Sequence, residues 1–143
     1  MSSHIKQIRE FNRFYTNILG LLNDRILDSP VSLTEGRVLF ELKERPSCKA
    51  KDLMELLCID RGYLSRLLAK LEKRGWVAKE VWQEDRRARA LSLTKAGMTL
   101  VAELERRSES QLERIIQPLS PADKTDLLQA MERIQHLLSQ PPK

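Results

Sequence analysis

The sequence has 143 residues, which suits one domain with an extension, and 41% of them are hydrophobic, enough for a packed core. Gly and Pro are few, so collagen-like and low-complexity classes are excluded. Short apolar runs predict no membrane-spanning helix, and residues 1–11 lack the apolar segment of a secretory signal. We therefore expect a cytoplasmic protein that does not bind membranes.

The net charge of +5 is concentrated in the middle of the chain. Residues 49–89 hold eleven Lys and Arg against seven Asp and Glu, so this segment alone carries a net charge of +4. A basic segment between nearly neutral stretches is typical of a module that faces nucleic acid.

Apolar residues at three- and four-residue steps predict a long amphipathic helix over residues 5–27, which Gly20 weakens and Asp28-Ser29-Pro30 ends. Ser32 and Glu35 form a capping box for a second helix, which stops before Pro46. Ser47 or Cys48 is expected to open a third, short helix that breaks near Ile59.

Asp60 is a good N-cap for a basic helix over residues 61–74, and Gly75 is a typical helix-stop residue. Three short helices with a basic third member indicate a helix-turn-helix. Residues 76–82 and 88–94 alternate as β-strands do, around a polar turn, and predict a hairpin. A helix-turn-helix followed by a hairpin is a winged helix.

Two further helices are predicted after the hairpin. Thr94 caps a long helix over about 95–117, with Met98, Val101, Leu104 and Leu112 on one face, and Ser120-Pro121 starts the last helix. The expected fold is mainly α with a small β-hairpin wing. We expect one domain over 1–143, with a winged-helix lobe at 30–95 and long helices at 1–29 and 96–140.

The predicted recognition helix has an apolar face of leucines and an opposite face whose residue types suit a major groove. The expected contacts to bases or phosphates on this helix are Arg61, Gly62, Tyr63, Ser65, Arg66 and Lys70. Lys49 and Lys51, at the start of the preceding helix, are expected to contact phosphates. The alternative is an ordinary amphipathic helix with a solvated basic face.

The predicted wing carries Arg86, Arg87 and Arg89 directly after an acidic pair. Arginines at a hairpin tip suit a narrow minor groove, where negative potential is concentrated. Asp85 would orient a guanidinium through a bidentate pair, so less entropy is lost on binding. The alternative is a charged turn that only keeps an edge strand soluble.

The segment RGYLSRLLAKLEKRGWV followed by DRRARALSLTKAG closely resembles the winged-helix core of MarR-family transcriptional regulators. The matching elements are Leu64-Ser65-Arg66, Leu71, Gly75-Trp76-Val77, Asp85-x-Arg87 and Leu93-Thr94-x-x-Gly97. The order of the surrounding elements matches as well. Residues 8–22 and 32–42 look closest to a subgroup in which the regulator is often fused to a GNAT acetyltransferase, so the chain is either a stand-alone member or part of such a fusion.

The resemblance implies a homodimer, with the first and the last two helices as the dimer layer, that binds a palindromic double-stranded operator. It also implies a repressor, released by a small anionic aromatic effector or by oxidation. Apolar stripes at both ends of the chain agree with a dimer. Arg9, Asn12, Arg13 and Tyr15 are candidates to line the effector pocket, although solvated helix-face residues are the favoured interpretation.

No catalytic set or phosphate loop appears, so we expect no enzyme activity and no cofactor. Two cysteines outside any CxxC motif, with His4 and His136 far apart, predict free thiols and no metal site. Cys58 is expected to be a small core residue. Cys48 is expected near a helix N-terminus and next to Lys49, which would lower its pKa. A redox-sensing role for Cys48 is the less favoured alternative, and full burial would discard it.

Two other functions remain open at this point. One is a regulatory domain of an acetyltransferase fusion. The other is a winged helix that binds an acidic protein instead of DNA, which weak and salt-insensitive DNA binding would favour.

Overall fold

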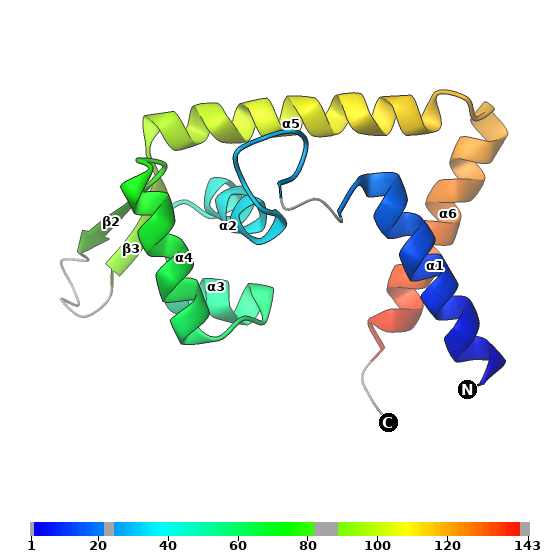
Figure 1. The fold of residues 1–143 in the computed structure, drawn as a ribbon, viewed down its shortest axis with the longest axis horizontal. Helices are drawn as coiled ribbons and strands as arrows, with labels where there is room; N and C mark the ends of the chain where they lie inside the picture. The colour runs from blue at the N-terminus through cyan, green and yellow to red at the C-terminus, as the bar shows by residue number, and fades with distance from the viewer. Residues whose placement is uncertain (1, 22–24, 82–88, 141–143) are drawn as a thin grey trace. The chain divides into compact units, whose positions relative to one another are not determined.

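The computed structural model describes residues 2–21, 25–81 and 89–140, in which the chain is mainly helical with a small antiparallel sheet, as predicted (Figure 1). The chain divides into two compact units, residues 1–107 and 108–143. The elements are, in chain order, α1 (Ser3–Leu19), α2 (Leu33–Glu44), β1 (Cys48–Lys49), α3 (Ala50–Leu57), α4 (Arg61–Lys73), β2 (Val77–Val81), β3 (Arg89–Leu93), α5 (Lys95–Ile116) and α6 (Pro121–Leu138).

Helix α1 is shorter than the predicted helix over 5–27, because Gly20 ends it instead of only weakening it. Gly20 has a φ of 67°, in the left-handed region that favours glycine, and its N–H donates to the carbonyl of Asn17. At the other end, the Ser2 hydroxyl accepts the N–H of Ile5. No residue of α1 is buried.

Helices α2, α3 and α4 form the predicted three-helix arrangement. The capping box at the start of α2 is present, with Ser32 and Glu35 exchanging both hydrogen bonds. The prediction that Ser47 or Cys48 opens α3 is wrong, because Ser47 has a φ of 62° and Cys48 belongs to a strand. Lys49 is the N-cap instead, and its backbone N–H donates to the Asp52 carboxylate.

The hairpin forms as predicted, with Val77 opposite Leu93 and Val81 opposite Arg89. A third strand, β1, pairs with β3 on its other side, so the sheet order is β1-β3-β2. The sequence did not predict β1, because a two-residue strand is too short to show alternation. Helix α4 packs beside β2 in the same unit (Figure 1).

The core of the first unit is built from leucines and valines of α2, α3, α4, β3 and α5. Its most deeply buried large side chains include Leu39, Leu42, Leu53, Leu64, Leu71, Leu91 and Leu104. Because each of these elements contributes only one apolar face, none of them can bury that face without the others. The core therefore fixes which side of α4 is left exposed.

Thr94 links the two ends of the hairpin to their neighbouring helices through hydrogen bonds to two glycines, Gly75 after α4 and Gly97 in α5. Gly75 ends the α4 turn with a φ of 82°, and its carbonyl accepts the Thr94 hydroxyl. The same hydroxyl oxygen accepts the Gly97 N–H at 3.0 Å, which caps α5 as predicted. A Cβ on Gly97 would lie 2.1 Å from the Trp76 carbonyl oxygen, so only glycine fits there.

Helix α5 buries Val101 and Leu104 of the predicted apolar face, whereas Met98 and Leu112 of that face are 60% and 44% exposed. Within the first unit, Arg107 of α5 donates to the backbone carbonyls of Leu27 and Asp28 at 3.0 and 2.8 Å. In the second unit, the Ser120 hydroxyl accepts the Asp123 N–H with Pro121 in the first turn, so α6 begins as predicted.

Candidate nucleic-acid interface

Helix α4 has one apolar face and one polar face, and packing against the core buries the apolar one. Asp60 caps the helix as predicted, its Oδ1 accepting the Tyr63 N–H at 2.8 Å. The buried face holds the four leucines of the predicted pattern, Leu64, Leu67, Leu68 and Leu71. The opposite face is therefore held outward along the whole helix.

The six α4 residues predicted to contact DNA are all exposed, namely Arg61, Gly62, Tyr63, Ser65, Arg66 and Lys70. Among the residues that the structure describes, no carboxylate forms an ion pair with Arg61, Arg66 or Lys70. Cations without internal partners retain their full capacity to neutralise phosphates. The tyrosine ring is 41% exposed on the first turn.

Arg74, by contrast, makes its contacts with other residues of the protein. Its Nη1 donates to the Pro30 carbonyl at 3.0 Å and lies 3.7 Å from the Glu35 carboxylate. Its guanidinium also lies 5.3 Å from the centre of the Trp76 ring, within the range of a cation–π contact. The basic residues of the helix thus separate into a structural arginine at its end and outward-facing cations along its polar face.

A groove of about 590 Å³ runs between the start of α3, α4 and the sheet. Its polar lining brings together four of the predicted contacts, Lys49, Lys51, Arg61 and Ser65, with Lys79 of β2. Its apolar lining includes Met54, Leu64, Leu68 and Leu91. Among the described residues, no Asp or Glu lines this groove.

Lys79 is a groove residue that the sequence reasoning missed. Its Nζ lies 3.0 Å from the Glu72 carboxylate of α4, which holds the ammonium at the border between helix and sheet. Alternate residues of a strand point to the same face, so Lys79 lies on the side of β2 that Val77 buries, and this spacing was the signal that could have been followed.

Most of the predicted wing contacts lie outside the described residues. These are Asp85, Arg86 and Arg87, so their minor-groove role and the orienting role of Asp85 stay predictions. Arg89 is the first residue of β3, and its backbone is in register with Val81.

The candidate effector residues Arg9, Asn12, Arg13 and Tyr15 all lie on α1 and are exposed. The Tyr15 ring stacks on Phe11, with ring centres 5.8 Å apart and planes 8° apart. Exposed side chains fit both an effector pocket and an ordinary solvated helix face, so the role of these residues in an effector pocket stays a prediction.

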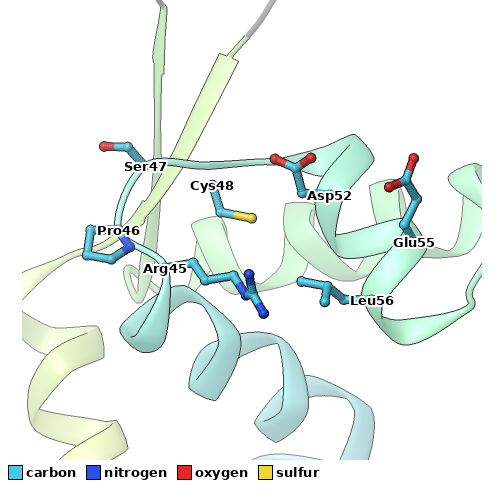
Figure 2. A pocket seen from close by; sticks show the side chains of 7 residues that line it. All are labelled: Arg45, Pro46, Ser47, Cys48, Asp52, Glu55 and Leu56. Atoms are coloured by element: carbon cyan, nitrogen blue, oxygen red, sulfur yellow. The ribbon is translucent and has the colours of Figure 1, made fainter. Parts of the chain in front are cut away.

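A second hollow, of about 480 Å³, lies between the end of α2 and α3, and Cys48 lines it (Figure 2). The Cys48 side chain is buried, with 5% of the residue exposed. Burial raises the pKa of this thiol, and the nearby Asp52 carboxylate raises it further. The expectation that Lys49 lowers its pKa is therefore wrong, and the redox-sensing role is discarded.

Cys58 is also placed differently from the prediction of a small core residue. It is exposed, because it ends α3 in a left-handed conformation with a φ of 54°. This conformation turns the chain from α3 toward Ile59 and α4, and the neighbouring Leu57 and Ile59 pack against the core instead.

In the part of the chain that the structure describes, no cluster of three or more His, Cys, Asp or Glu side chains is arranged to hold a metal ion. Nor does any described helix combine the length and the hydropathy needed to cross a bilayer.

Comparison with known proteins shows which family and which solved structures this chain is similar to. The model of the MarR family matches residues 31–89, which include helices α2 to α4 and strand β2 and end at the first residue of β3. The transcriptional regulator PecS of Dickeya dadantii is 28% identical over 130 residues, covering 85% of this chain and 78% of PecS.

Two solved structures have the same fold. Streptococcus pneumoniae FabT, solved in complex with DNA, superposes with a TM-score of 0.80 at 20% identity, covering 94% of this chain and 96% of FabT. Bordetella bronchiseptica BpsR, whose DNA binding is regulated by 6-hydroxynicotinic acid, gives a TM-score of 0.70 at 22% identity over 91% and 98%. The similar proteins are regulators of transcription, not enzymes. Residues 31–89 of this chain thus match the MarR family of transcriptional regulators, and the chain has the winged-helix fold of the solved structures.

Proposed function

We propose that this regulator binds a palindromic double-stranded operator as a homodimer, with α4 in the major groove. The observation that carries the proposal is the exposed face of α4, where Arg61, Arg66 and Lys70 have no ion-pair partner among the described residues. The adjoining groove adds Lys49 and Lys51, which suit phosphates on either side of a major groove. FabT, which shares the fold, has been solved with DNA bound.

In this proposal, residues 30–95 form the DNA-binding lobe, and residues 1–29 and 96–140 form the dimer layer. Helices α1 and α6 contain no buried residue, although each carries large apolar side chains. Exposed apolar faces of this size support a subunit interface. Arg86 and Arg87 of the wing would reach the adjacent minor groove, with Asp85 orienting Arg87.

We also propose that a small anionic or aromatic effector modulates DNA binding, and that the protein acts as a repressor in the cytoplasm. BpsR provides a precedent for control by such a compound. Arg9, Asn12, Arg13 and Tyr15 are the candidate pocket residues on α1. Loss of operator binding with a panel of aromatic carboxylates, abolished by Arg13→Ala, would support this role.

Within the family, we place the chain near the subgroup that is often fused to GNAT acetyltransferases, on residues 8–22 and 32–42. A phylogeny of regulator domains with and without an attached acetyltransferase tests this placement. Grouping with unfused members only would contradict it.

The main experiment measures binding of the purified protein to its own upstream region as a function of salt concentration. We expect tight binding whose logarithm falls steeply with the logarithm of salt, by about 0.9 per phosphate neutralised. Lys51→Ala should weaken binding to all sequences and lower the slope by about 1. Binding no tighter than to random DNA, at every salt concentration, would refute the proposal.

A further inference from the structure

Gly62 lies on the first turn of α4, between the capping residue Asp60 and Arg66 one turn later. A Cβ built on Gly62 would lie 3.4 Å from Nη1 of Arg66 and 3.4 Å from Oδ1 of Asp60. The Arg66 side chain therefore runs back along the helix, and its guanidinium lies over the backbone of the glycine. This direction is the one that long side chains favour in helices, toward the N-terminus.

Among the described residues, neither an ion pair nor a side-chain hydrogen bond holds the Arg66 guanidinium in this place. A guanidinium near the N-terminus of a helix is disfavoured by the helix dipole. Two features offset this. Position 62 has no side chain, which leaves room for the guanidinium, and the Asp60 carboxylate also borders that room, 3.4 Å from the Cβ position.

We propose that Gly62 is a positioning residue for Arg66, and that the space above it sets the direction in which Arg66 meets the operator. The inference rests on the proposed DNA-binding function. A guanidinium reads a guanine edge through two N–H groups in one plane, so its approach direction decides which base it can reach. A side chain already held in that direction also loses less entropy on binding.

The size of residue 62 should therefore control sequence-specific binding. Gly62→Ala adds a single carbon, 3.4 Å from Nη1 of Arg66, and should weaken operator binding less than a larger side chain does. Gly62→Val adds two γ carbons in the space that the guanidinium or the Asp60 carboxylate occupies. Valine is no worse than glycine in a helix, so the fold should be kept, and thermal unfolding checks this. We expect Val to weaken operator binding by about tenfold, with little change on random DNA.

A double-mutant cycle separates positioning from direct contact of residue 62 with DNA. In an Arg66→Ala background, the additional effect of Gly62→Val should largely disappear. An equal loss in both backgrounds would overturn the inference, because residue 62 would then act without Arg66.

A measurement without DNA keeps this inference separate from the proposed function. In the free wild-type protein, a nuclear Overhauser effect is expected between the Gly62 Hα and the Arg66 side chain, and the Val variant should lose the corresponding contact. Its absence in the wild type would overturn the positioning role even if the operator binds tightly. Its presence in a protein with no operator preference would refute the DNA-binding function, and with it the role of Gly62 in recognition.

Discussion

The winged-helix lobe and the terminal helices α1 and α6 differ in how much of their apolar surface the chain covers. In the lobe, Leu39, Leu53 and Leu71 are fully buried. On α1, Phe14 is 62% exposed, and on α6, Leu138 is 81% exposed. The lobe therefore has a core of its own, whereas the terminal helices carry apolar residues that a second copy would cover in the proposed dimer.

The largest expected effect comes from removing a leucine from the lobe core. Leu39→Ala should lower the free energy of unfolding by about 2–5 kcal/mol, through lost burial and the cavity that remains. Leu138→Ala is the control on α6 and, at protein concentrations too low for the proposed dimer to form, should change it by less than about 0.5 kcal/mol. Urea unfolding measures both variants. Similar losses at the two positions would contradict the comparison.

The second largest expected loss of stability concerns the close contact between Gly97 at the start of α5 and the backbone of Trp76. Gly97→Ala would push a Cβ against the Trp76 carbonyl oxygen, so the helix start must shift. We expect a loss of about 1–3 kcal/mol in the free energy of unfolding, comparable to overpacking a core.

Gly62→Ala is the control for Gly97→Ala, because a Cβ at position 62 meets only side-chain atoms, 3.4 Å away, and no backbone. It should be neutral or stabilising by up to about 1 kcal/mol, as alanine favours a helix over glycine. Thermal unfolding compares the two variants, and a harmless Gly97→Ala would show that the joint tolerates a side chain.

The third effect tests the terminal helices directly. Ile8, 56% exposed on α1, belongs to the stripe proposed as dimer interface. Ile8→Ala should weaken the dimer by about 1–2 kcal/mol for each subunit, the value of the buried carbons removed. Sedimentation at several concentrations measures the dissociation constant.

Glu10→Ala, on the opposite face of α1, should leave the dissociation constant unchanged. If Ile8→Ala instead lowers the stability of the lobe at all protein concentrations, the stripe packs within the chain and the comparison fails.

The same contrast explains what could be predicted from the sequence. Elements that carry their own local signal were predicted closely, such as the capping box at Ser32 and the Asp60 cap of α4. The leucine face of the recognition helix was also predicted, because its spacing alone defines it.

The errors arose where tertiary structure decided the outcome. The strand β1 exists only because β3 pairs with it, and Cys58 is exposed because the α3–α4 turn takes a left-handed residue. Lys79 joined the groove through the strand pairing, and the burial of Cys48 reversed the expected shift of its pKa. The pairing of β1 with β3 joins residues more than 40 positions apart in the chain, so the sequence around Cys48 could not predict it.

The smallest expected effect on stability concerns Glu103, which helps to hold the hydrogen bonds between α5 and the turn before α2. Hydrogen bonds from Arg106 and then Arg107 lower the pKa of Glu103 to about 2, from an ordinary value of 4.5. Arg107 in turn donates to the carbonyls of Leu27 and Asp28, which both have a φ of 53°. The carboxylate thus helps to hold an arginine that fixes a strained turn.

Because the folded-state pKa lies below the unfolded one, the stabilisation by Glu103 is complete above pH 4.5 and is lost as the pH falls toward 2. Glu103→Gln should therefore be slightly less stable than the wild type at pH 7, and this difference should shrink between pH 4.5 and pH 2. The urea midpoint at several pH values measures it, with Glu109→Gln on the same helix as control for net charge. A difference that stays constant over this range would show that the ion pairs do not stabilise the fold. Solvent screens these exposed charges, so the effect remains well below that of a lost core leucine.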